Sequence, residues 1–214
     1  MFRNTISATP IVDLNPALSR LSHGRIDMIA LETGNPRLHG LLMDAWRQAH
    51  FRGDSSENLD GDTAAVLDNF YRDSIRAAPA SIQAEYWRLK VDQRNWLRLH
   101  GARSCQPIIQ DQAYTTRYDF PLDMQDRFLA LRVSVWSSVR DAPPPRSASV
   151  TIPGAIAAAA ARRADLGPDA FRRALRGGAS QDVVCAAQIA LAETALALPP
   201  AESARLLRDL TSIE

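Results

Sequence analysis

Residues 81–101 read SIQAEYWRLKVDQRNWLRLHG and carry the most regular helical pattern in the chain. Apolar side chains recur in this stretch at the spacing of one helix face. Gly101 follows at a position where glycine is favoured, because it readily adopts the positive φ of a helix C-terminus. The stretch therefore predicts a helix over residues 81–100. Its apolar face consists of Ile82, Tyr86, Leu89, Trp96 and Leu97.

Two further helices are predicted upstream, over residues 36–50 and 62–78. Asn35 is a suitable N-cap for the first, and Pro36 suits the first helical position. Asp62 is expected to cap the second helix, which Pro79 ends because proline cannot donate a backbone hydrogen bond. The apolar faces of the three helices are expected to form the main core. The core residues predicted on this basis are Trp46, Phe70, Tyr86, Leu89 and Trp96.

Proline and glycine interrupt residues 1–36 often enough to disfavour a long helix. Residues 27–31 are apolar enough for one buried turn or a short strand. The remainder is expected to lie over the domain as an extended arm.

Residues 122–139 fit the alternation of a half-buried strand and the stripe of a helix equally well. Asp123 and Asp126 lie near the start of this stretch, and Arg132 and Arg140 lie towards its end. That order of charge complements the helix macrodipole, so a helix is expected. The weaker pattern before it leaves room for a small β element around residues 105–135.

The stretch DAPPPRS at residues 141–147 marks a boundary, because consecutive prolines form a semi-rigid spacer. We predict an N-terminal helical domain over residues 1–140, a linker over 141–149 and an Ala-rich helical subdomain over 150–214. The fold class is mainly α, with a bundle-like arrangement of helices. Helices of the C-terminal subdomain are expected at 153–164, 168–176, 180–198 and 200–210.

Composition argues against several classes of protein. The 214 residues are 46% hydrophobic and 23% charged, as in ordinary globular domains. A formal net charge of +1 is unlike the basic domain of a dedicated nucleic-acid binder. Two cysteines, Cys105 and Cys185, are expected to be buried thiols. No apolar leader or membrane-length apolar run is visible, so a cytoplasmic location is expected.

The sequence identifies no catalytic residues. If the chain is an enzyme, the first residues to consider are His39, His50 and Asp54, in or just beyond the helix over residues 36–50. The two histidines lie three helical turns apart on one face, about 16 Å from each other, which is too far to share a metal. The nearby acidic run lacks the closing glutamate of a calcium loop, and capping of the next helix is the preferred interpretation. No metal and no cofactor are expected. The acidic run consists of Asp54, Glu57, Asp60 and Asp62.

Two helices offer candidate binding residues. The stretch 85–103 interleaves aromatic and basic side chains, as surfaces that bind single-stranded nucleic acid do. An amphipathic core helix with a solvated basic face explains the same pattern. The helix over 180–198 is apolar almost all round, so it is either central in its subdomain or docked against a partner or a second copy. The candidate residues are Trp87, Arg88, Arg94, Arg98, Val184, Leu191 and Leu198.

Taken together, these features predict a non-enzymatic intracellular interaction protein, such as an adaptor, an accessory subunit or an assembly factor. Its partner is expected to be another protein or a second copy of the chain, and neither a membrane nor a nucleic acid is expected. Two alternatives stay open. One is an enzyme with a dispersed site near His39, His50 and Asp54, and the other is a nucleic-acid-binding regulator that uses residues 85–103.

Overall fold

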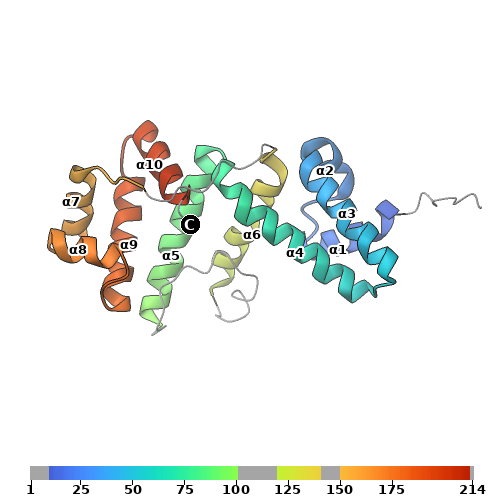
Figure 1. Ribbon diagram of the computed structural model, residues 1–214, viewed down its shortest axis with the longest axis horizontal. Coiled ribbons are helices and arrows are strands. Elements are labelled where there is room, and N and C mark those ends of the chain that lie inside the picture. The colour runs from blue at the N-terminus through green and yellow to red at the C-terminus, as the bar shows by residue number, and fades with distance from the viewer. Residues whose placement is uncertain (1–9, 101–119, 141–149, 213–214) are drawn as a thin grey trace, which may run out of the picture. The chain divides into compact units, whose positions relative to one another are not determined.

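The computed structural model describes residues 10–100, 120–140 and 150–212 (Figure 1). Every regular element in these ranges is a helix, so the predicted mainly α class is confirmed. The part of the proposed β element that falls within the described residues is helical, and residues 105–119 lie outside them. The helices are α1 (Pro10–Ser22), α2 (Met28–Gly34), α3 (Pro36–Arg52), α4 (Ser56–Ser74), the 3-10 turn η1 (Ile75–Ala77), α5 (Ala80–Leu99), α6 (Leu122–Ser138), α7 (Gly154–Arg163), α8 (Pro168–Leu175), α9 (Gln181–Leu196) and α10 (Pro200–Ser212).

The predicted extended arm is wrong for the part of residues 1–36 that the structure describes. Two short helices, α1 and α2, occupy it instead. Asp27 caps α2 by accepting a hydrogen bond from the backbone N–H of Ala30 at 2.7 Å. Gly24, at φ +72°, turns the chain between the two helices. The breakers therefore divide the segment into short helices, which are stabilised by burial of their apolar faces rather than by length.

Asn35 caps α3 as predicted, and it does more than that. Its side-chain oxygen accepts a hydrogen bond from the backbone N–H of Leu38 at 3.1 Å. Its side-chain nitrogen donates to the backbone oxygens of Trp136 and Val139, at 2.6 and 2.9 Å. The buried side-chain amide of Asn35 thus provides hydrogen-bond partners both for a backbone N–H at the start of α3 and for backbone oxygens at the end of α6. Gly53, at φ +71°, ends α3 two residues beyond the predicted end at residue 50.

Helix α4 begins earlier than predicted, at Ser56 rather than at residue 62. The side chain of Ser55 accepts a hydrogen bond from the backbone N–H of Asn58 at 3.3 Å, which is the geometry of an N-cap. Asp60 and Asp62 consequently lie inside the helix. The prediction that they cap it is wrong, because a serine further upstream takes that role.

The helices form two compact units whose limits differ from the predicted domain boundaries. Unit 1 comprises Met1–Ser74 with Arg132–Ala142, and unit 2 comprises Ile75–Leu131 with Pro143–Glu214. Helix α6 contributes residues to both. The predicted linker over residues 141–149 lies outside the described residues. The C-terminal helices belong to the same unit as α5, because α9 and α10 both pack against it.

The core of unit 1 is built around Trp136, which is fully buried. Its indole N–H donates to the backbone oxygen of Leu67 at 3.0 Å, and the guanidinium of Arg132 lies 4.8 Å from its ring centre. Arg132 also pairs with Asp68. Burial lowers the pKa of Arg132, while the charge of Asp68 acts in the opposite direction. The surrounding core includes Leu14, Leu18, Leu38, Leu42 and Phe70.

Helix α5 is the centre of unit 2. Its Trp87 is buried and donates its indole N–H to the backbone oxygen of Leu207 at 3.2 Å and to the hydroxyl of Thr211 at 2.9 Å. The ammonium of Lys90, also fully buried, lies 4.7 Å from the ring centre of Tyr86 and 5.1 Å from that of Trp87. These contacts join α5 to α10 and place cation–π interactions inside the core.

Three of the five predicted core residues are buried, namely Phe70, Tyr86 and Leu89. Trp46 and Trp96 are only half-buried. Trp96 stacks on His100 with ring centres 4.0 Å apart and lies 4.9 Å from the ring of Phe120. Helical periodicity places these tryptophans on apolar faces, but neighbouring helices cover each of them only in part.

Cys185 is buried, as predicted, but it is disulfide-bonded, so the prediction of a thiol is wrong for this residue. Cys105 lies outside the described residues.

Candidate functional site

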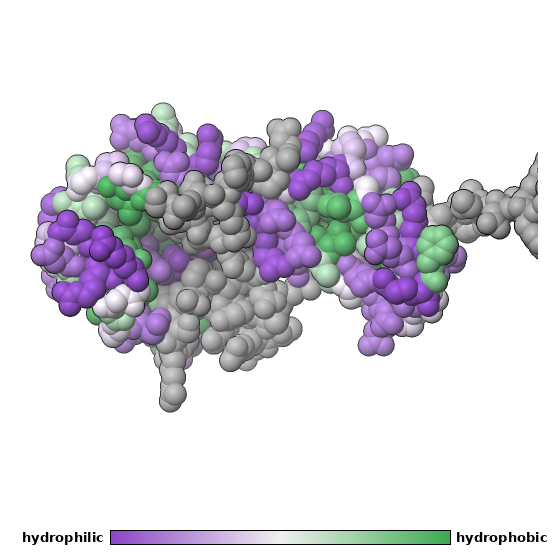
Figure 2. Space-filling view, viewed as in Figure 1, coloured by the Kyte–Doolittle hydropathy of each residue, from purple (hydrophilic) through white to green (hydrophobic). Residues whose placement is uncertain are grey.

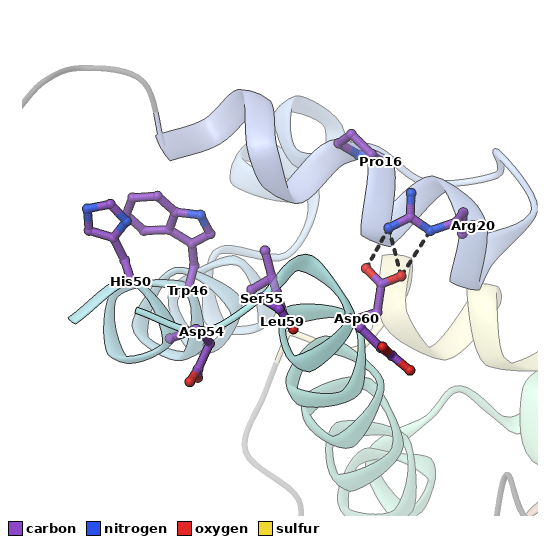
Figure 3. A pocket seen from close by; sticks show the side chains of 10 residues that line it. Pro16, Arg20, Trp46, His50, Asp54, Ser55, Leu59 and Asp60 are labelled. Carbon is purple, nitrogen blue, oxygen red and sulfur yellow. Dashed lines mark hydrogen bonds and ion pairs between the residues drawn. The ribbon is translucent and has the colours of Figure 1, made fainter. Parts of the chain in front are cut away.

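A cavity of about 610 Å³ opens on unit 1 between α1, the end of α3 and the start of α4 (Figure 3). This volume falls within the range of sites that bind small molecules or side chains. Short local signals create the site: Gly53 ends α3, and Ser55 starts α4 two residues later. The cavity lining includes Arg20, Trp46, His50, Asp54, Glu57 and Asp60.

One wall of the cavity is aromatic. Trp46 and His50 lie one helical turn apart on α3, and their rings stack with centres 5.1 Å apart and an interplanar angle of 10°. Figure 3 shows the two rings side by side, both rising from the end of α3. Both side chains are at least partly exposed, so the stack presents aromatic surface to the cavity.

The opposite wall is an ion pair between α1 and α4. The guanidinium of Arg20 contacts the carboxylate of Asp60 through three hydrogen bonds of 2.6 to 3.0 Å (Figure 3). Such forked contacts are the strongest form of guanidinium–carboxylate pairing. The pair ties the two helices together across the cavity.

A second arginine organises the turn between α3 and α4. Arg52 pairs with Asp54 at 2.6 Å and also with Asp62. The hydrogen bonds that Arg52 donates, first to Asp54 and then to Asp62, raise the pKa of Arg52. Figure 3 shows the carboxylate of Asp54 pointing away from Trp46. Asp54 therefore contributes more to the turn than to the aromatic wall.

The site carries more negative than positive charge. The guanidiniums of Arg20 and Arg52 stand against the carboxylates of Asp54, Glu57, Asp60 and Asp62. Within the described part of the chain, Glu57 pairs with no basic side chain. It lies in the first turn of α4, where the helix macrodipole favours a negative charge.

The structure brings together two of the three residues named for the enzyme alternative. His50 and Asp54 both line the cavity, whereas His39 does not. The Nε2 atom of His39 is buried and has no hydrogen-bond partner among the described residues. The two histidines share one face of α3 as predicted, but only His50 lies close enough to the helix end to reach the cavity.

The predicted binding residues of α5 do not form one surface. Trp87 and Arg94 are buried, whereas Arg88 and Arg98 are exposed. The aromatic part of the pattern thus belongs to the core of unit 2. The basic part divides between core and surface.

The predicted residues of α9 are also largely enclosed. Leu191 is buried, and Val184 and Leu198 are half-buried. Helices α5, α7, α8 and α10 pack around α9, which gives it the central position that was one of its two predicted roles. Much of its apolar surface is therefore already covered by the chain itself.

Arg98 lines a smaller cavity of about 300 Å³ in unit 2, between α5, α7 and α9. Arg163 and Glu193 form an ion pair of 3.1 Å at this cavity, and its apolar part is formed by Ala186, Ile189 and Ala190. Figure 2 shows a hydrophilic surface around α8, where Arg172, Arg173 and Arg176 are exposed. The positive and negative groups at this cavity balance, which gives it no clear preference for a ligand charge.

Within the described ranges, no three His, Cys, Asp or Glu side chains converge as a metal site would require. Asp60 instead pairs with Arg20, and Asp54 and Asp62 pair with Arg52.

The sequence-based reasoning missed Phe51, whose ring is 90% exposed at the end of α3. The position of Phe51 on the helix indicates this exposure. Leu38, Leu42 and Ala49 define the buried face of this helix, and Phe51 lies about 200° around the axis from Ala49 at 100° per residue. It follows His50 of the cavity directly in sequence.

None of the helices in the described part of the chain has the length and hydropathy that crossing a membrane requires. Comparison of the chain with protein-family models, with curated proteins and with solved structures finds no match.

Proposed function

We propose that this chain is a non-enzymatic interaction protein, which binds a protein partner through the end of unit 1. The contact surface, here called the α3 tip, consists of Trp46, His50, Phe51 and the adjoining cavity. The single observation that carries the proposal is the 90% exposure of the Phe51 ring, which directly follows His50 of an open cavity with an aromatic wall. Aromatic and arginine side chains dominate the binding energy of protein interfaces.

The chemistry of the cavity favours binding over catalysis. Asp60 is held by Arg20, and Asp54 is held by Arg52, through hydrogen-bonded ion pairs. A carboxylate that is paired in this way is already engaged by a guanidinium. The hydroxyl of Ser55 is engaged in capping α4. These groups therefore shape and charge the cavity.

Replacing Phe51 with alanine tests the proposal. The variant should fold as stably as the parent chain, within about 0.5 kcal/mol, because the ring is exposed. Loss of an aromatic anchor from an interface typically costs about 2 kcal/mol or more of binding free energy. We therefore expect recovery of the partner from lysate of the native cell, quantified by mass spectrometry, to fall at least tenfold.

The matched control is Ile29→Ala, which removes a 71% exposed apolar side chain from α2 of the same unit. It should recover the partner as well as the parent chain does. Equal recovery by the parent and the Phe51→Ala variant would contradict a role of the α3 tip. Equal losses in both variants would point to non-specific hydrophobic adhesion.

A further inference from the structure

We infer that the cavity of unit 1 accepts an arginine side chain of the partner. The inference rests on the proposed function and adds the chemistry by which the partner is recognised. Three features carry it, namely the charge of the cavity, its aromatic wall and the way in which it already holds Arg20.

The charge of the cavity selects a cation. Among the side chains that line it, Arg20 stands against the carboxylates of Asp54, Glu57 and Asp60. Asp60 pairs with Arg20, and Asp54 pairs with an arginine outside the lining, whereas Glu57 pairs with no basic side chain of the described residues. A positive group in the cavity would reduce this excess of negative charge. An anionic group would increase it, so carboxylate and phosphate ligands are disfavoured.

The aromatic wall selects a flat cation. The stack of Trp46 and His50 uses one face of each ring, and Trp46 remains half-exposed. Cations bind favourably over the face of tryptophan, and the planar guanidinium stacks there as well. An ammonium group is attracted to the same ring but is not planar and cannot stack on it. The aromatic wall therefore favours arginine over lysine.

Arg20 illustrates the mode of binding. Its guanidinium reaches the cavity from α1 and engages Asp60 in a forked contact. Glu57 lies three residues before Asp60 on α4, so both carboxylates project from neighbouring turns of one helix. An incoming guanidinium can pair with Glu57 while its plane lies against the aromatic wall.

The test uses the full chain labelled with ¹⁵N and three acetylated, amidated tripeptides, in which glycine flanks arginine, lysine or citrulline. Citrulline has nearly the shape of arginine but no charge. The indole N–H signal of Trp46, assigned by its loss in Trp46→Phe, reports binding. We expect a saturable shift with the arginine peptide. The lysine peptide should bind about threefold more weakly, because it cannot stack on the ring. The citrulline peptide should bind at least about tenfold more weakly, because it has lost the charge.

Two variants with equal changes of charge locate the cation. Glu57→Gln should lower the affinity for the arginine peptide about three- to tenfold, as expected for loss of a charge-assisted contact. Glu32→Gln, on α2 of the same unit and outside the cavity lining, should change it less than about twofold. Equal effects of the two variants, or equal binding of the arginine peptide and either comparison peptide, would overturn the inference.

The outcomes separate this inference from the proposed function. Loss of the partner by Phe51→Ala without binding of the arginine peptide refutes only the arginine assignment. The opposite result is that the arginine peptide binds while Phe51→Ala recovers the partner undiminished. That result refutes the α3 tip as the protein contact and also the claim that the arginine comes from a partner.

Discussion

Replacing Trp87 with alanine is expected to lower the free energy of unfolding by about 3–5 kcal/mol, the usual cost of removing a buried tryptophan. Trp87 is 4% exposed, and its indole N–H is bonded to both Leu207 and Thr211 of α10. The substitution leaves a cavity between α5 and α10 and removes one hydrogen bond from each of two buried oxygens. Equilibrium unfolding in urea, followed by far-UV circular dichroism, measures the loss.

The neighbouring residue provides the control for this prediction. Arg88→Ala should change the stability by no more than about 0.5 kcal/mol, because most of its side chain is exposed and its contact with Glu85 at 3.6 Å lies on the surface. Trp87→Phe should fall between the two, since it keeps most of the apolar volume. A loss below about 1 kcal/mol in Trp87→Ala would contradict the packing of α10 on α5.

Replacing Asp68 with alanine is expected to destabilise the protein by about 3–5 kcal/mol. The reason is the charge that remains. Arg132 is only 5% exposed, and removal of its paired carboxylate leaves a guanidinium buried without that compensation. The lowered pKa of Arg132 reflects the same desolvation. Urea unfolding of the parent and the variant measures the difference.

Two comparisons distinguish a buried charge from a lost contact. The double variant Asp68→Ala/Arg132→Met should recover a large part of the stability, because an apolar side chain then fills the site without a charge. Asp44→Ala breaks a surface pair with Arg47 and should cost no more than about 0.5 kcal/mol. A double variant as unstable as Asp68→Ala would show that packing, rather than charge, causes the loss.

Local signals explain why several helices were predicted closely. The ends of α3 depend on Asn35 and Gly53, whose capping role is encoded within a few residues of the helix. Pro168 starts α8 for the same kind of reason. Periodicity within α5 correctly placed Tyr86 and Leu89 in the core. In each case the decisive interaction is between residues close together in the chain.

The errors arise where contacts distant in sequence decide the outcome. Short helices such as α1 and α2 are stabilised by packing against other helices, which local sequence does not show. The prolines and glycines of this segment therefore suggested an extended arm. The candidate site needed Arg20 of α1 beside Asp60 of α4, a pairing that no local pattern predicts. His50 and Asp54 could be proposed from the sequence because they flank one helix end. Phe51 was not predicted because helical periodicity identifies the apolar face of α3, and Phe51 lies on the opposite side of that helix.

Hydrophobic period, caps and breakers act within a few residues, so the amino-acid sequence is enough to predict that this chain is helical. The same period predicts which side chains share a face of α5. Which of those faces are covered depends on tertiary packing, because a face is buried only where another helix packs against it. That is why Trp87 and Arg94 lie in the core while Arg98 lies at the surface. It is also why the helices after residue 150 join α5 in one unit.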